Sequence, residues 1–298
     1  PTYIRARLDY VAVLHKRQKY QRALEEAKTL FDEDPHNASI IVTWANTLLA
    51  TGRYDEAIGA YRSALEKQPG EHTVHLAMGH ALKTVGRVSE AIECYRESFN
   101  QKQDYGDAYW SLANLKTYGF SDAELSQMET YQQDPATSED DRIHLSFALG
   151  KAYEDRAEYE TSFGHYARGN ALKHAHGRFN RKWFANELDH QKAHFDQRFF
   201  EQRSTFGHQA PDPIFILGLP RAGSTLLEQI LASHSQVDGT RELGNIVGLA
   251  HRFNGRSNSS DTAKYPAMLE QLNEEEARSL GEAYIEDTCE HRGQAPFF

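Results

Sequence analysis

The amino-acid sequence predicts a mainly α-helical protein, in which an array of helix pairs precedes the first part of an α/β domain. Two observations carry this prediction: a 34-residue internal repeat in the first half, and a short apolar run followed by a glycine-bounded loop in the second half. A third observation excludes the main alternative, because 9 prolines and 20 glycines in 298 residues leave little room for the turns of an all-β fold.

Charge and hydropathy narrow the class of protein. The chain carries 33 Lys and Arg against 43 Asp and Glu, a net charge of −10, which argues against a main role in binding nucleic acid. The mean hydropathy of −0.70 and the lack of a long apolar run predict no membrane span and no export signal. Cys94 and Cys289 are far apart in the sequence, so we expect no disulfide, no cysteine metal site and a cytoplasmic location.

The internal repeat defines the first half of the chain. A small-residue position recurs every 34 residues at Ala23, Ala57 and Ala91, and an apolar position recurs at the same spacing at Leu14, Leu48 and Leu82. We expect the alanines to lie where two antiparallel helices cross closely, with Tyr61 and Tyr95 filling the space beside them. Each unit is therefore predicted to be a helix pair that buries its apolar face against its neighbours.

Two further units continue the array. A degenerate fourth unit is expected near residues 108–131, and a fifth at about 143–176, with Ser162 in the small-residue position. The acidic run 139–141 precedes the fifth unit, where we expect a solvated cap at a positive helix end. Cys94 is predicted to be a small core residue.

This pattern resembles the tetratricopeptide repeat. The resemblance implies that residues 1–176 form a superhelix whose concave surface binds a protein or peptide, with homo-oligomerisation or bracing of the second domain as alternatives. Arg7, His75 and Lys83 are expected to be exposed charges on the inner helices.

Residues 177–212 are expected to link the two domains. Phe184, Leu188, Phe195 and Phe199 have the spacing of one amphipathic helix. His174 and His176, just before it, are two residues apart and point in different directions on a helix, so we expect no metal site there.

Residues 213–298 begin a second domain. The apolar run 214–217 predicts a buried parallel strand, and the loop from Gly218 to Gly223 has the G-x-x-x-x-G spacing of a phosphate-binding loop before a helix. Ser224 stands where a nucleotide triphosphatase has lysine, and Arg221 supplies the positive charge instead. ATP or GTP hydrolysis is disfavoured, because the lysine and a strand-borne aspartate for Mg²⁺ are both missing. A guanidinium can instead grip a terminal phosphate or sulfate through two parallel hydrogen bonds.

The segment from Pro213 to Glu242 resembles the 5′-phosphosulfate loop of sulfotransferases. Together with the repeats it resembles the bacterial tetratricopeptide-repeat-containing sulfotransferases, whose catalytic part is similar to that of tyrosylprotein sulfotransferases. The resemblance implies 3′-phosphoadenosine 5′-phosphosulfate as the donor and no metal. It also implies catalytic roles for Arg221 and for Glu242 as general base, and donor binding by Arg221, Ala222, Gly223, Ser224 and Thr225.

Several alternatives stay open. Glu242 has the sequence position of a helix N-terminal acid as well as that of a base. No candidate for the family's 3′-phosphate-binding motif is found, so we expect the domain 213–298 to be truncated and the activity to belong to the full-length protein. A non-catalytic repeat scaffold and a kinase-like nucleotide enzyme are the competing functions. The acceptor is left as a protein tyrosine, a sugar or a small molecule.

Overall fold

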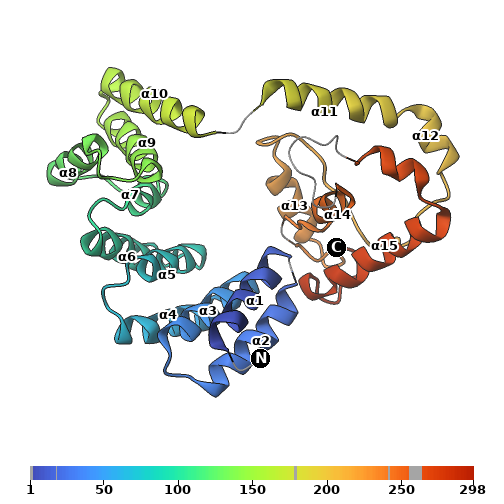
Figure 1. Cartoon of the computed structure of the whole chain (residues 1–298), viewed down its shortest axis with the longest axis horizontal. Coiled ribbons are helices and arrows are strands. Elements are labelled where there is room, and N and C mark those ends of the chain that lie inside the picture. Colours follow the sequence, from blue (N-terminus) through green and yellow to red (C-terminus); the bar gives the residue numbers. More distant parts are fainter. Residues whose placement is uncertain (1–2, 18, 178–179, 241, 255–263) are drawn as a thin grey trace. The chain divides into compact units, whose positions relative to one another are not determined.

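The computed structural model describes residues 3–17, 19–177, 180–240, 242–254 and 264–298. The chain divides into two compact units, Pro1–Phe179 and Asn180–Phe298, and Figure 1 shows the helices of each. Among the described residues, no helix is both long and apolar enough to cross a membrane.

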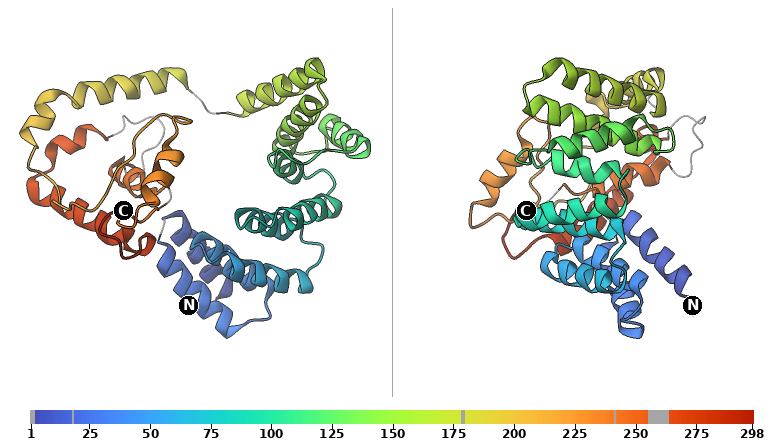
Figure 2. Two further views of the ribbon diagram at one scale, coloured as in Figure 1. Left: turned by 180° about the vertical axis from the view of Figure 1, so that it is seen from behind. Right: turned by 90° about the vertical axis from the view of Figure 1, so that its left-hand side faces the viewer.

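The first unit is a row of helices that follow one another in pairs. Their bounds are α1 Ile4–Lys16, α2 Tyr20–Glu33, α3 Ala38–Ala50, α4 Tyr54–Lys67, α5 His72–Thr84, α6 Val88–Gln101, α7 Gly106–Ala113, α8 Asp122–Gln133, α9 Glu139–Asp155 and α10 Tyr159–His176. Each helix packs on the next in the chain, apart from α7 and α8, which are joined through α9. The stacked pairs follow a curved row (Figures 1 and 2), and the predicted helical superhelix is confirmed.

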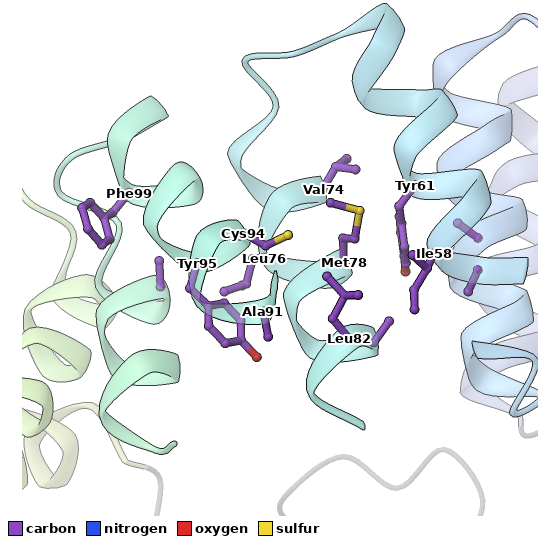
Figure 3. Close-up of a cluster of buried hydrophobic side chains, with 14 of the residues drawn as sticks. Ile58, Tyr61, Val74, Leu76, Met78, Leu82, Ala91, Cys94, Tyr95 and Phe99 are labelled. Carbon is purple, nitrogen blue, oxygen red and sulfur yellow. The ribbon is translucent and has the colours of Figure 1, made fainter. Parts of the chain in front are cut away.

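The repeated small and aromatic positions form the core of this unit. Ala23, Ala57 and Ala91 are fully buried, as are Tyr61 and Tyr95, and Figure 3 shows the cluster around α4, α5 and α6. Helix α5 comes close to Tyr95 at Gly79, where an added Cβ would lie 2.6 Å from the ring. The large ring therefore fits only because the facing residue has no side chain.

The fifth unit repeats this arrangement. An added Cβ at Gly150 would lie 2.6 Å from the ring of Tyr166, and the Ser162 hydroxyl donates a hydrogen bond of 2.7 Å to the Gly150 carbonyl. Cys94, in the third unit, is buried, and burial raises the pKa of its thiol to about 11. Its predicted role as a core residue is confirmed.

The prediction for the acidic run 139–141, which forms the first turn of α9, is wrong in one respect. Asp141 is buried rather than solvated, and its carboxylate accepts a hydrogen bond of 2.9 Å from the Gly106 amide and pairs with Lys102 at 3.2 Å. The cap of α9 is Ser138, whose side chain accepts from the Asp141 amide. Asp141 is buried because it joins α9 to the start of α7, a contact that local sequence does not encode.

The second unit is less regular. Its helices are α11 Arg181–His194, α12 Gln197–Gln202, α13 Ser224–Ala232, α14 Asn245–Asn254 and α15 Glu274–Thr288, with short 3₁₀ turns η1 Ala267–Gln271 and η2 Cys289–His291. The single amphipathic helix predicted for the linking segment is wrong, because α11 ends before Phe195 and Asp196 caps α12 by accepting from the Phe199 amide at 2.7 Å. A capping aspartate starts a new helix rather than continuing the old one.

The buried strand predicted for residues 214–217 is also not formed. The backbone of this segment pairs only at its start, where the Ile214 amide donates to the Phe298 carbonyl at 2.7 Å and the Phe298 amide donates to Asp212 at 3.0 Å. Leu217 is 90% exposed. A parallel strand needs neighbours that bond along its whole length, and in the described residues Phe298 alone fills that place.

Candidate phosphate-binding site

The predicted phosphate-binding loop connects the extended segment 213–217 to helix α13 through a tight turn. The Ala222 amide donates to the Leu219 carbonyl at 3.1 Å, and two residues of the loop have left-handed backbone, Arg221 with φ 67° and Gly223 with φ 91°. Glycine adopts this conformation without strain, whereas at Arg221 it carries a strain on the order of 1–2 kcal/mol. Strained backbone of this kind is concentrated at binding sites.

Gly223 also begins the helix. It is the N-cap of α13, and no side chain caps the first turn. A left-handed residue followed by a helical one turns successive amide groups toward one point, and the positive end of the helix dipole adds to their attraction for an anion. The backbone of Gly223, Ser224 and Thr225 thus has the arrangement that an anion-binding turn requires.

The side chains around this turn are accessible. Arg221, Ala222, Gly223 and Thr225 are exposed and Ser224 is half-buried. Within the described part of the chain, the Arg221 guanidinium makes no hydrogen bond or ion pair. Its donors are therefore available to a ligand oxygen.

Glu242 lies outside the helices, three residues before α14 begins at Asn245. Its side chain is exposed, and it shares no hydrogen bond with any other described residue, including Arg221. The structure therefore places the five loop residues together at the start of α13, and in the part of the chain that it describes no hydrogen bond or ion pair joins Glu242 to them.

The base of the loop is held by residues that the sequence analysis missed. The Phe297 amide donates to Gln236 and the Asp238 amide donates to Phe297, at 3.2 and 2.9 Å, which forms a parallel bridge between Val237 and Phe297. Since Phe298 pairs on its other side with residues 212–214, the last two residues lie between two segments that flank α13. This is the bonding pattern at the start of a parallel sheet, the layer that supports such loops.

Two aspartates fix this arrangement. Arg292 forms an ion pair with Asp212 and its guanidinium lies 4.4 Å from the centre of the Phe298 ring. Asp238 accepts a hydrogen bond of 3.0 Å from the Ala295 amide. No local pattern in the sequence singles out Asp212 or Asp238, since each partner lies more than fifty residues away in the chain.

Segment 236–239 packs closely on α13. An added Cβ at Gly239 would lie 2.7 Å from the Ala232 Cβ and from the Glu228 carboxylate. Gly239 therefore lets the chain pass against the helix that the loop begins. The fold and this site define a helical-repeat protein with an anion-binding loop at the start of an α/β unit.

Comparisons with known proteins assign both parts. Residues 213–298 match the sulfotransferase family, and residues 14–60 and 48–115 match the tetratricopeptide repeat. The chain thus has tetratricopeptide repeats in its N-terminal part and a sulfotransferase-family region in its C-terminal part, as the sequence analysis predicted.

An uncharacterized protein of Aquifex aeolicus (strain VF5) is 27% identical over 190 residues, which are 61% of this chain and 24% of that protein. The chain therefore matches about a quarter of the length of this relative.

Solved structures with a similar helical array include three proteins. MamA from Desulfovibrio magneticus RS-1 is 15% identical over 57% of this chain and 95% of its own, with a TM-score of 0.43. BtubC from P. vanneervenii is 16% identical over 57% and 79%, with a TM-score of 0.46. The C-terminal part of a TPR repeat-containing protein from Cytophaga hutchinsonii is 19% identical over 56% and 64%, with a TM-score of 0.43. The assignment of the repeats depends on the family match and not on these likenesses.

Proposed function

We propose that the protein is a sulfotransferase that moves a sulfuryl group from 3′-phosphoadenosine 5′-phosphosulfate to a hydroxyl acceptor. The family match of residues 213–298 supports the reaction class. The observation that carries the proposal is the loop, in which a left-handed Gly223 begins a helix two residues after an exposed arginine. Backbone amides and a guanidinium at one turn are the donors that a phosphosulfate group requires.

The chemistry assigns a role to each residue. The acceptor oxygen attacks sulfur, the bond from sulfur to the 5′-phosphate oxygen breaks, and adenosine 3′,5′-bisphosphate leaves. Arg221 and the amides of the loop stabilise the charge that develops on the leaving phosphate. The Glu242 carboxylate takes the proton of the acceptor hydroxyl.

Donor binding tests the role of the loop. In the full-length protein, Arg221→Ala should weaken binding of adenosine 3′,5′-bisphosphate by about 2 kcal/mol, because a charge-assisted pair is lost. Calorimetric titration with the bisphosphate and with ATP gives the comparison. Unchanged bisphosphate affinity in a folded Arg221→Ala variant contradicts the role of Arg221. Preference for ATP indicates the kinase-like alternative, and binding of neither nucleotide favours the non-catalytic scaffold.

We also propose that the concave face of the repeats presents the acceptor, or a protein that carries it. Exposed polar residues at equivalent positions support this role. Tyr61 donates a hydrogen bond of 2.6 Å to the Asn46 side chain, and Tyr95 lies 3.0 Å from Nδ1 of His80, one repeat later. Buried tyrosines thus hold two polar side chains in fixed positions, which lowers the entropic cost of binding an extended peptide.

Steady-state kinetics separate the two roles. Glu242→Gln keeps the shape of the side chain but cannot accept the proton, so kcat should fall on the order of a hundredfold with little change in donor affinity. Lys83, which is exposed on α5, belongs to the repeat unit and not to the phosphate-binding loop, so Lys83→Glu should raise KM for a protein acceptor and leave kcat unchanged. Arg7 is unsuitable for this test because it is paired with Glu33.

If Glu242→Gln lowers the unfolding temperature and keeps its specific activity, Glu242 has a structural role. If Lys83→Glu leaves KM unchanged, this part of the repeat face does not contact the acceptor.

A further inference from the structure

Helix α11 places two histidines one turn apart, at positions that the sequence analysis did not consider. The Nε2 atoms of His190 and His194 lie 3.0 Å apart, and the two ring centres lie 4.6 Å apart with an angle of 86° between the ring planes. Residues four apart on a helix share a face, so the spacing alone brings the two imidazoles together.

The rings do not have the geometry of a straight hydrogen bond. A linear N–H···N bond with this nitrogen separation would place the ring centres about 5.3 Å apart, since each nitrogen is about 1.2 Å from its ring centre. The observed 4.6 Å is shorter. At least one lone pair therefore points away from this line, as it does in two rings whose lone pairs meet at a point beside the line.

That point has the position of a shared metal ion. With metal–nitrogen distances of about 2.0–2.1 Å, a nitrogen separation of 3.0 Å gives an angle of about 94° at the metal. Two ligands of a tetrahedral ion would have nitrogens about 3.3 Å apart, whereas neighbouring ligands of a square-planar or octahedral ion meet at about 90°. The His190–His194 pair therefore fits square-planar or octahedral coordination better than tetrahedral coordination.

A carboxylate on a separate segment orients one of the rings. Glu270, in η1, pairs with Nδ1 of His194, and Arg203 donates a hydrogen bond of 2.7 Å to the Glu270 carbonyl. A carboxylate on Nδ1 holds the proton there and leaves the lone pair on Nε2, which is the tautomer that ligates metals.

The second ring has no such support. His190 Nδ1 is buried without a hydrogen-bond partner, and ligation through Nε2 leaves a proton on it. An unpaired buried donor costs about 1–3 kcal/mol, so the site is expected to bind a metal only moderately tightly. The described residues contain no group of three or more His, Cys, Asp or Glu side chains around one ion, so water must complete the coordination.

We propose that His190 and His194 form a two-imidazole site for a divalent transition-metal ion with right-angled coordination, and that Glu270 orients His194. Cu²⁺ and Ni²⁺ adopt this geometry more readily than Zn²⁺. The site is independent of the proposed sulfuryl transfer, since its residues lie on α11 and η1 and not on the loop that begins α13.

Metal titration of the full-length, tag-free protein tests this site. Calorimetry with Cu²⁺, Ni²⁺ and Zn²⁺ at neutral pH should show binding of one Cu²⁺ that His190→Ala or His194→Ala weakens at least tenfold. Glu270→Gln should weaken it about tenfold, which is the usual effect of losing an orienting carboxylate. His36→Ala is the matched control, because His36 is exposed and has no histidine four residues away. The His36→Ala variant should bind Cu²⁺ with the affinity of the wild type.

The metal series tests the geometry. Ni²⁺ should bind more tightly than Zn²⁺, and tighter binding of Zn²⁺ contradicts a right-angled site. Equal Cu²⁺ affinity in the wild type and in a His190→Ala/His194→Ala variant overturns the proposal. If the histidine substitutions unfold α11, the Glu270→Gln variant still tests the proposal, because it leaves the sequence of α11 intact. Unchanged Cu²⁺ affinity in the Glu270→Gln variant also overturns the proposal.

Discussion

The repeat array and the sulfotransferase-family region differ most in how they bury apolar side chains. All the residues of the main hydrophobic cluster lie between Val11 and Ala152. In the described part of residues 180–298, the buried side chains are Pro266, Thr288 and Phe298, while Leu217, Leu219 and Leu226 are mostly exposed.

The contrast follows from the range of the contacts that each architecture needs. A repeat unit completes its core against the next unit in the chain, so the partners of its apolar side chains lie in the same or an adjacent unit. A parallel sheet pairs segments that are distant in sequence, and among the described residues the backbone of Phe297 and Phe298 bonds to segments near residues 213 and 237 for only a few hydrogen bonds. Partial pairing leaves the apolar side chains of the loop and of α13 in solvent.

The largest expected effect comes from matched leucines in two helices. Leu82 in α5 is 1% exposed and Leu226 in α13 is 67% exposed. Leu82→Ala should lower the free energy of unfolding by about 2–5 kcal/mol, and Leu226→Ala should change it by less than about 0.5 kcal/mol. Urea unfolding followed by circular dichroism gives both values. Equal effects would show that α13 is as well packed as the repeats.

Two glycines, one in the repeat array and one in the sulfotransferase-family region, allow the same comparison for the backbone. An added Cβ at Gly106 would lie 2.3 Å from the Asp141 carbonyl oxygen, whereas Gly223 has open space around it and a φ of +91°. Gly106→Ala should therefore destabilise the array by about 1–3 kcal/mol through overpacking. Gly223→Ala should cost about 1 kcal/mol through backbone strain alone.

Both glycine variants are measured by thermal unfolding of the full-length protein, with bisphosphate affinity as a second readout. Gly223→Ala should weaken bisphosphate binding, and Gly106→Ala should not. The reverse pattern contradicts the assignment of Gly223 to the phosphate site.

The smallest expected effect per residue is the pH dependence of the free energy of unfolding, which comes from histidines in the repeat array. Burial lowers the pKa of His15, His80 and His165 from 6.5, so the folded state binds fewer protons than the unfolded state. Stability is then fully present above pH 6.5 and is lost as the pH falls below it, by at most about 1.4 kcal/mol per pH unit for each histidine.

Urea unfolding between pH 7.5 and 5 measures this slope. His80→Gln should reduce it, whereas substitution of the exposed His36 should leave it unchanged. A slope that is the same in both variants would mean that His80 does not contribute.

The sequence by itself determined the repeat array. The 34-residue period placed the buried alanines and tyrosines correctly, and Gly52 and Gly86 both adopt a φ of 79° at the turns between paired helices. It also determined the anion-binding turn, because a glycine before Ser224 is enough to begin α13 with a left-handed residue. Both features depend on contacts within one unit or within a few residues.

The tertiary structure alone decided the rest. Asp141 is buried because Gly106 and Lys102, more than thirty residues away in the chain, complete its hydrogen bonds. The apolar segment after Pro213 has the composition of a strand, yet a strand forms only where neighbouring backbone supplies partners. His194 is paired with Glu270, on a segment that no local pattern connects to α11. In each case the deciding partner is distant in sequence, and local propensity and periodicity carry no information about it.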